Sequence, residues 1–345
     1  MNPPMKAVFL QGHGGNEVVQ CGEQPRPTPG PGEVLVRLRA STVNQVDLYM
    51  RNSGAGITHQ LPQIMGLDGA GEIESTAGDP AFTVGQRVLV HPGIACGRCE
   101  FCLRGQDVLC TRYSLLGEHR HGTWAQVVAL PARNVFCTPT HLDDVQAAAL
   151  GVNHLTAWRM VVSQARLQPW ETVLIFGIGG GVSLAALQIA QALGARTLVT
   201  SRHADKLERA RALGADVVID SSREDVAKAV MSHTAGRGVD VVIENVGAAV
   251  WSSALKSLVR GGRIVTCGAT SGDQPGADLR RLFIRQLQVM GSTLGSLHEM
   301  HELLAFVNRH QLTPVMDQVF ELDQVHAALD RLDSGLQFGK VGLRI

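Results

Sequence analysis

A glycine-rich run, Gly177-Ile178-Gly179-Gly180-Gly181-Val182-Ser183, separates two segments of different periodicity in this chain. The apolar run before it, Thr172–Phe176, predicts a buried strand, and the spacing of apolar residues over Val182–Leu193 predicts a helix that ends at Gly194. A glycine-rich turn at such a place lets a pyrophosphate approach the backbone, where the N–H groups of the first helical turn point at it. The run alone is equally compatible with an ordinary turn.

Further strands and helices surround this run. Apolar runs recur at the interval of repeated strand–helix units, at Thr197–Ser201, Val217–Ile219, Val239–Ile243, Arg263–Cys267 and Leu287–Met290. Strands apolar on both faces that alternate with helices predict a parallel, doubly wound sheet, and this context favours a dinucleotide site. Ligands of such sheets bind beyond the carboxyl ends of the strands. The residues expected there are Gly177, Gly179, Gly180, Gly181, Val182, Asn245, Gly247, Gly268 and Ala269.

The end of the second strand bears on the choice of cofactor. A carboxylate about twenty residues beyond the loop would hold the ribose hydroxyls of NADH. This chain has Ser201 and Arg202 there, with Lys206 one helical turn further on. These side chains could hold a 2′-phosphate, so NADPH is expected and NADH is possible. The alternative is that Arg202 and Lys206 are solvated charges at a helix start.

Four of the seven cysteines lie within fifteen residues, at Cys96, Cys99, Cys102 and Cys110. Four thiolates on one loop can complete a tetrahedral shell around zinc and leave no open position for a substrate. The spacing therefore predicts one structural zinc. Arg98 and Arg104 could help stabilise the thiolate-rich loop, or both could simply be exposed. An iron–sulfur cluster has related spacings, but nothing else in the chain indicates a further electron carrier.

The first third of the chain has a different character. Val34–Ala40 alternates with the period of a half-buried strand, and Gly71–Thr76, Arg87–His91 and Ala125–Leu130 continue the pattern between glycine and proline turns. This predicts an irregular, β-rich domain or small barrel.

Length and composition limit the classes of function. A chain of 345 residues exceeds what one hydrophobic core usually serves, so two domains are expected. The formal net charge is zero, which argues against a nucleic-acid or anionic-membrane partner. The odd number of cysteines argues against a disulfide framework. The start of the sequence does not have the pattern of a secretory signal, so none is expected. A cytoplasmic protein with a small-molecule substrate is expected.

Together these features resemble the medium-chain dehydrogenase/reductase superfamily, the relatives of zinc alcohol dehydrogenases and quinone oxidoreductases. Besides the cysteines and the glycine loop, the resemblance rests on Met5-Lys6-Ala7-Val8, Pro29-Gly30-Pro31-Gly32-Glu33-Val34-Leu35-Val36, Gly66-Leu67-Asp68-Gly69-Ala70-Gly71, Leu155-Thr156-Ala157-Trp158 and Gly339-Lys340-Val341. It implies an α/β protein in which a GroES-like β-rich catalytic domain precedes a Rossmann domain. The boundaries expected are 1–151 with a zinc lobe at about 92–112, then 152–297, and a returning segment at 298–345. The resemblance also implies an active site between the domains.

One departure from the resemblance concerns the catalytic metal. Zinc alcohol dehydrogenases hold this ion with a cysteine, a histidine and a second cysteine, and by motif those places fall on Asn44, Leu67 and Val152. Asparagine, leucine and valine do not form a zinc site. The segment from Val43 to Arg51 instead looks like the zinc-independent quinone-oxidoreductase branch.

The resemblance implies four catalytic candidates. Asn44 would offer its amide to the substrate or the nicotinamide, Tyr49 would relay a proton, Asp68 would orient its neighbours and Thr156 would lie near the nicotinamide. Each has a structural alternative: an asparagine that fixes a turn, a packed tyrosine, a buried carboxylate paired with an arginine and a helix-capping threonine.

Three functions follow from these features. Without a metal, reduction of a polarised C=C bond or a quinone by NADPH is favoured, because hydrogen-bond donors can hold the developing enolate. The alternative is an NAD(P)-dependent alcohol dehydrogenase whose metal site is rebuilt from Asp68, His119 and His154. A non-enzymatic NADPH-binding protein is the third. In each case the strand near Leu287–Ser292, at the expected edge of the sheet, could pair with a twin in a homodimer or homotetramer.

Overall fold

The computed structural model describes residues 3–345, which divide into two compact units. Unit 1 comprises the described residues of Met1–Val152 together with Ser296–Ile345, and unit 2 is Asn153–Gly295. None of the helices in the described residues combines the length and the apolar character that crossing a bilayer requires.

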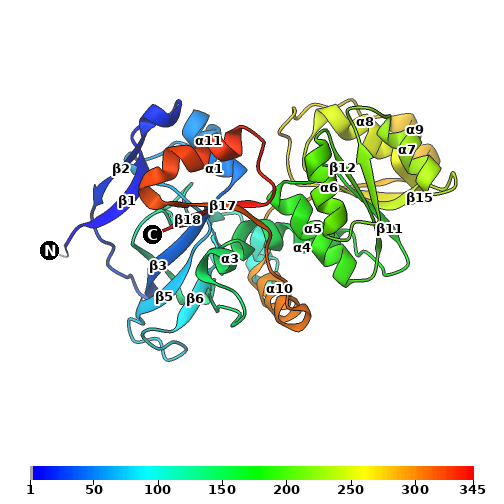
Figure 1. The fold of residues 1–345 in the computed structure, drawn as a ribbon. Helices are drawn as coiled ribbons and strands as arrows, with labels where there is room; N and C mark the ends of the chain where they lie inside the picture. The colour runs from blue at the N-terminus through cyan, green and yellow to red at the C-terminus, as the bar shows by residue number, and fades with distance from the viewer. Residues whose placement is uncertain (1–2) are drawn as a thin grey trace. The chain divides into compact units, whose positions relative to one another are not determined.

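Unit 1 is built mainly from antiparallel strands, which surround most of its core (Figure 1). One sheet has the order β2-β1-β4, with bounds Val19–Gln24, Met5–Leu10 and Gln63–Ile64. The larger sheet has the order β10-β6-β5-β3-β18-β17, with bounds Val135–Cys137, Arg87–Val90, Ala70–Ser75, Glu33–Val43, Lys340–Arg344 and Met316–Glu321, and β9 (Val127–Pro131) also pairs with β3. The long strand β3 is therefore central, since it pairs with β5, β9 and β18.

Four helices and a small lobe complete unit 1. The helices are α1 (Gln45–Ser53), α3 (Asp144–Ala148), α10 (Leu297–His310) and α11 (Val325–Asp333). The lobe carries the cysteines between β7 (Gly93–Ile94) and β8 (Ser114–Leu115), and includes the short helix α2 (Glu100–Leu103). Helix α1 begins directly after β3, and α11 packs on β18, so both helices lie beside the same pair of strands.

Unit 2 contains one six-stranded parallel sheet with helices on both faces (Figure 1). Its order is β13-β12-β11-β14-β15-β16, with bounds Val217–Asp220, Arg196–Ser201, Thr172–Ile175, Val239–Glu244, Leu258–Thr266 and Gln288–Gly291. The helices are α4 (Leu155–Trp158), α5 (Gly181–Ala192), α6 (Ala204–Ala212), α7 (Val226–His233), α8 (Ala248–Ser257) and α9 (Leu279–Arg285). Counted from β11, this is the strand order 3-2-1-4-5-6 of a dinucleotide-binding sheet.

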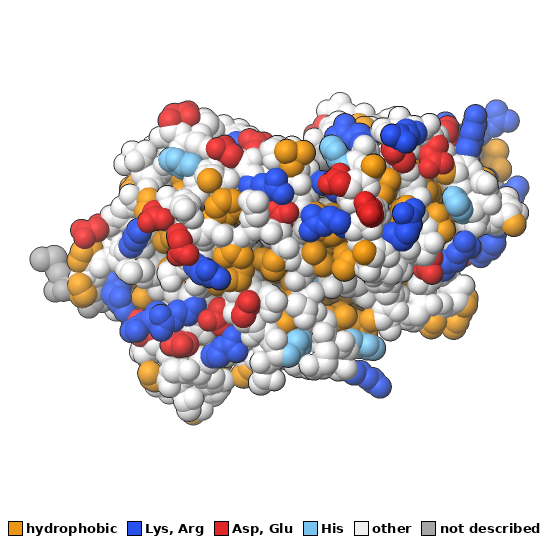
Figure 2. Space-filling model, viewed as in Figure 1, with side chains coloured by type: hydrophobic (Ala, Val, Ile, Leu, Met, Phe, Trp, Pro, Cys, Tyr) orange, Lys and Arg blue, Asp and Glu red, His pale blue; other side chains and the backbone are white. Residues whose placement is uncertain are grey.

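The predicted α/β class is confirmed, with one β-rich part and one doubly wound parallel sheet. Five of the six strands expected from apolar runs in unit 2 agree within one residue at each end, which is the usual uncertainty of such boundaries, whereas β15 begins at Leu258, five residues before the expected start at Arg263. On the face shown in Figure 2, basic and acidic side chains are interspersed over unit 1, as the zero net charge suggests.

Candidate functional site

A buried polar cluster lies in unit 1 where β3 ends and β18 begins. Val341 pairs with Val43 in the antiparallel register, so Lys340 at the start of β18 lies close to Asn44 at the end of β3. Asp68 reaches the same place from the segment between β4 and β5. Asn44 and Lys340 are 3% exposed and Asp68 is 0% exposed, so each of these polar groups needs a partner inside the protein.

One carboxylate oxygen is the centre of the cluster. Oδ2 of Asp68 accepts hydrogen bonds from the hydroxyl of Thr42, from Nδ2 of Asn44 at 2.9 Å and from Nζ of Lys340 at 3.1 Å. Three donors, one of them an ammonium, stabilise the charge on this oxygen. The structure thus brings together two predicted residues, Asn44 and Asp68, and adds two that were not predicted.

The ammonium of Lys340 has three acceptors. Besides Asp68, it donates to Oδ1 of Asn44 at 2.7 Å and to the backbone oxygen of Val43 at 3.1 Å. A lysine ammonium has three N–H donors and no acceptor, so its hydrogen-bonding capacity is filled. Burial lowers the pKa of Lys340, and the neighbouring Asp68 opposes that shift.

Two further buried carboxyl groups lie near this ion pair. Asp47, in the first turn of α1, accepts a hydrogen bond from the backbone N–H of Asn44 at 2.8 Å. Burial raises the pKa of Asp47 to about 8, with the Asn44 N–H and Lys340 opposing the shift and Asp68 and Glu118 adding to it. Burial also raises the pKa of Glu118, to about 7. Asp47 is therefore mostly protonated at neutral pH.

The second oxygen of the Asp68 carboxylate faces a glycine. Oδ1 is buried and has no hydrogen-bond partner among the described residues. A Cβ atom on Gly151 would lie 2.7 Å from this oxygen and 3.1 Å from the backbone oxygen of Val90. Position 151 therefore has no room for a side chain without displacing the carboxylate.

The positions that correspond to a catalytic zinc site do not fit a zinc ion. Leu67 and Val152 have no lone pairs to offer. The amide oxygen of Asn44 and Oδ2 of Asp68, which could ligate a metal, both accept from the Lys340 ammonium. The Lys340 ammonium thus occupies these two oxygens, and Oδ1 of Asp68 is the one carboxylate oxygen of the cluster without a partner among the described residues.

The rebuilt metal site that was considered as an alternative would need Asp68, His119 and His154. In unit 1, Asp68 has the partners described above, while Nδ1 of His119 accepts from the backbone N–H of Leu115 at 3.2 Å. In unit 2, Nε2 of His154 is 3.2 Å from Oε1 of Gln188. Because such a site would draw ligands from both units, it stays a hypothesis.

Tyr49 and Thr156 remain predictions as catalytic residues. Tyr49 lies on α1 and its side chain is 39% exposed, unlike the cluster at the start of that helix. Thr156 is buried in α4, which packs against α5 of the same unit. Both the functional and the structural interpretation of each residue are compatible with these positions.

The four cysteines converge in the lobe of unit 1. Their sulfur atoms all lie within 4.8 Å of one another, with 3.5 Å between Cys99 and Cys102 and 3.9 Å between Cys96 and Cys102. Sulfurs in a tetrahedral site with zinc–sulfur bonds of about 2.3 Å lie about 3.8 Å apart. The thiols thus fit a zinc ion. Within either unit, this is the only place where three or more potential metal ligands of the described residues lie close together.

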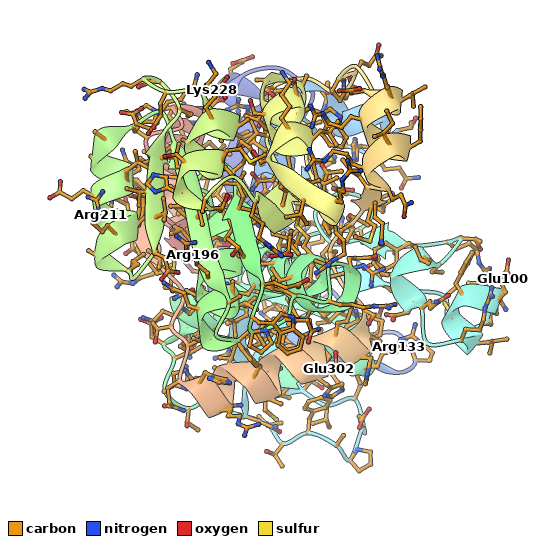
Figure 3. The ribbon with its side chains drawn as sticks, turned by 90° about the vertical axis from the view of Figure 1, so that its right-hand side faces the viewer. Glu100, Arg133, Arg196, Arg211, Lys228 and Glu302 are labelled. Atoms are coloured by element: carbon orange, nitrogen blue, oxygen red, sulfur yellow. The ribbon has the colours of Figure 1, made fainter. Side chains whose placement is uncertain are left out.

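Several arginines contact the lobe, each in a different way. The backbone N–H of Arg98 and the side chain of Arg112 lower the pKa of Cys96 to about 5, which favours a thiolate. Arg104 instead forms an ion pair with Glu100 at 2.6 Å, and Figure 3 shows Glu100 at the outer end of the lobe. Arg133 holds the base of the lobe, since it donates to the backbone oxygen of Ala95. Arg104 thus contacts Glu100 of the same loop from an exposed position, which agrees with both interpretations of this residue.

The glycine loop of unit 2 connects β11 to α5. Gly177 and Gly179 have φ values of +66° and +113°, which other residues rarely adopt. A Cβ atom on Gly179 would also lie 2.7 Å from Cδ of Lys206. Gly180 is the N-cap of α5. The loop therefore has the bare backbone and the helix N-terminus that a pyrophosphate group needs, and the residues fit a dinucleotide.

Glu244 joins the two predicted turns at the ends of β14 and β15. Its Oε1 accepts from the backbone N–H groups of Val246 and Gly247, and its Oε2 accepts from Thr266 at 2.9 Å. A Cβ atom on Gly247 would lie 2.9 Å from Cα of Ala269, and one on Gly268 would lie 2.9 Å from the oxygen of Asn245. The predicted residues Asn245, Gly247, Gly268 and Ala269 therefore pack tightly together at the carboxyl ends of these two strands.

Sequence reasoning missed Lys340, Thr42, Asp47 and Glu244 as site residues. Lys340 carried a signal, because it stands in a Gly339-Lys340-Val341 motif at the start of an apolar run where a lysine is unusual. Thr42 and Asp47 are polar residues beside Asn44 that any strand end or helix start can contain. Glu244 follows an apolar strand, but only the fold shows that both of its oxygens bind turns.

Comparison with known proteins agrees with this arrangement. Residues 30–140 match the model of the alcohol dehydrogenase GroES-like domain, and residues 181–309 match that of zinc-binding dehydrogenases. An alcohol dehydrogenase of Geobacillus stearothermophilus is 32% identical over 95% of this chain and 96% of its own length. An NAD-dependent alcohol dehydrogenase of Sulfolobus acidocaldarius is 30% identical over 99% of this chain and 100% of its own. A solved NAD-dependent alcohol dehydrogenase, 41% identical, has a TM-score of 0.95 and covers 99% of this chain and 100% of its own.

Proposed function

Because this chain belongs to the zinc-type medium-chain dehydrogenase/reductase superfamily, a group of oxidoreductases, we propose that it transfers hydride between a nicotinamide cofactor and an alcohol or its carbonyl product. The observation that carries this proposal is the similarity to alcohol dehydrogenases over nearly the whole chain. It supports the alcohol dehydrogenase alternative better than the C=C or quinone reduction favoured from the sequence.

The redox step balances in either direction. In oxidation, the carbinol carbon loses a hydride and the hydroxyl group loses a proton; in reduction, the carbonyl carbon gains the hydride and its oxygen gains a proton. The glycine loop around Gly177 and Gly179 would hold the nicotinamide cofactor, which when bound would supply the acceptor or donor of the hydride. On the protein side, Asn44 and Thr42 donate hydrogen bonds to Asp68 and so hold its carboxylate in place.

A second function is favoured by one feature, the absence of a zinc ligand set at Asn44, Leu67 and Val152. Reduction of a polarised C=C bond or a quinone depends less on a Lewis acid than alcohol oxidation does. We keep this as the second candidate, with an enone, a quinone or an enoyl thioester as acceptor.

For the cofactor we propose NADPH. Ser201 ends β12 and Arg202 follows it, the run from Leu198 to His203 contains no carboxylate, and Lys206 lies over Gly179 of the phosphate loop. Two of the relatives described above are named NAD-dependent, so NADH is the competing cofactor. We propose one zinc ion per chain for the cysteine lobe, with a structural role, since four thiol ligands leave no open position.

The test is a substrate panel measured with both cofactors in both directions. Alcohols and their aldehydes or ketones form one group, and enones, quinones and enoyl thioesters form the other. Turnover of the first group supports the main proposal, while turnover of the second group alone supports the second candidate. Cofactor binding without turnover of either group would contradict both and indicate a non-enzymatic protein.

A further inference from the structure

The polar cluster of unit 1 allows only one orientation of the Asn44 amide. The carboxamide of Asn44 lies between an ammonium that can only donate and a carboxylate that can only accept. Its oxygen must therefore face Lys340 and its nitrogen must face Asp68. The orientation of this amide, which the shape of the side chain alone would leave ambiguous, is fixed by its two partners.

The cluster is also balanced in charge without a metal. Lys340 and Asp68 form a buried pair 3.1 Å apart. Asp47 stays mostly protonated at neutral pH because its pKa is about 8. A divalent ion placed on the same oxygens would face the ammonium and leave its own charge uncompensated in a buried site, which is costly.

We propose that Lys340 is the positioning residue of this site: its ammonium takes the place of a catalytic cation, fixes the Asn44 amide and holds the Asp68 carboxylate. This inference rests on the proposed oxidoreductase function and assigns a role to Lys340 that neither the glycine loop nor the cysteine lobe requires. Lys340 acts through Asn44 and Asp68 and does not itself transfer a proton, because its three N–H groups already have acceptors.

The test compares Lys340→Met and Lys340→Arg with a matched control, Arg331→Met. Arg331 also forms an ion pair in unit 1, with the buried Asp317 at 2.7 Å, but it lies outside the cluster. Lys340→Met is expected to lower kcat by about 100-fold, as misplacement of a reacting geometry does, with the cofactor Kd unchanged. Arg331→Met is expected to lower the Tm and leave kcat unchanged.

A second measurement does not depend on activity. In nitrogen-15 spectra, the side-chain amide of Asn44, assigned through its loss in Asn44→Asp, is expected to exchange slowly with solvent in the wild type and faster in Lys340→Met. If Lys340→Met does not fold, Lys340→Arg replaces it. Arginine keeps the charge but cannot place three donors on one atom, so kcat should again fall.

Two outcomes would overturn the inference. One is a Lys340 variant that, like Arg331→Met, loses stability but keeps the wild-type kcat. The other is an Asn44 amide that exchanges equally fast with and without Lys340. A wild type that turns over neither substrate group would instead defeat the proposed function, and the exchange measurement would still report on the positioning by Lys340.

Discussion

Asp47 shows how one buried carboxyl group can couple stability to pH. Its pKa in the folded protein is about 8, against 3.8 for the free side chain, because burial disfavours the charged form. Between these two values the folded state binds the proton and the unfolded state does not. The free energy of unfolding should therefore fall as the pH rises from about 4 to about 8. Above that range the contribution of Asp47 to this free energy should no longer change with pH.

The isosteric variant Asp47→Asn isolates this contribution. Lys340, Asp68 and Glu118 all act on Asp47, and burial also raises the pKa of Glu118, but these groups are present in both proteins. Urea denaturation across this pH range should give a steeper decline for the wild type than for the variant. Parallel curves for the two proteins would show that Asp47 is ionised when folded.

Arg202 carries the proposed preference for NADPH. It is exposed at the end of β12, where a 2′-phosphate would need a bidentate donor. Arg202→Ala should raise the KM for NADPH by about tenfold, equivalent to about 1.4 kcal/mol, and leave the KM for NADH unchanged. Arg211→Ala is the control, because Arg211 is exposed on the following helix (Figure 3). An equal effect on both cofactors would contradict the assignment.

At the scale of elements, the cysteine lobe is a loop whose order should depend on its metal. The short helix α2 and the pair β7–β8 are too small to hold the segment by themselves. Cys99→Ser should reduce zinc from one ion per chain to almost none. A loss of about 2 kcal/mol would lower the Tm by roughly 4–8 °C in a unit of this size. Cys137→Ser, which removes an exposed thiol outside the lobe, should keep the zinc; equal zinc loss in both variants would refute the assignment.

The edge strand β16 is the second element with a testable role. It pairs only with β15, its side chains are largely exposed, and Leu279, Phe283 and Ile284 of α9 add an exposed apolar surface beside it. Unpaired edges of this kind associate readily. We propose that β16 pairs with β16 of a second copy in a homodimer, or in a tetramer built from such dimers.

Val289→Lys tests this pairing, because the lysines of the two copies would lie on neighbouring strands and repel each other. The dissociation constant, measured by analytical ultracentrifugation, should rise at least about tenfold. Trp170→Lys is the control, since Trp170 is an exposed apolar residue of unit 2 outside β16. A wild type that sediments as a monomer at all concentrations would exclude the dimer.

For the whole molecule, those elements that are recognisable from residues close together in the sequence could be predicted. The glycine loop, the buried strands of unit 2 and the cysteine lobe each consist of neighbouring residues whose spacing, taken together with the surrounding elements, favours one explanation. Helices such as α1 and α11 were not predicted, because their amphipathic patterns are short and mixed with polar residues.

The polar cluster could be predicted only in part. Asn44 and Asp68 stand in recognisable motifs, but Lys340 reaches them from almost the other end of the chain through the pairing of β18 with β3. The spacing of residues along the chain holds no information on that pairing. The apolar run after Lys340 makes a lysine unusual at that position, but it does not say which residues the ammonium contacts.

The central claim is that hydride transfer proceeds beside a cation supplied by the protein, while the only zinc is held by four thiolates. Anomalous diffraction at the zinc edge, from crystals of the active, cofactor-bound protein grown with excess zinc, tests it most directly. We expect one peak, among the sulfurs of Cys96, Cys99, Cys102 and Cys110. A second peak within bonding distance of Asn44 or Asp68 would contradict the account.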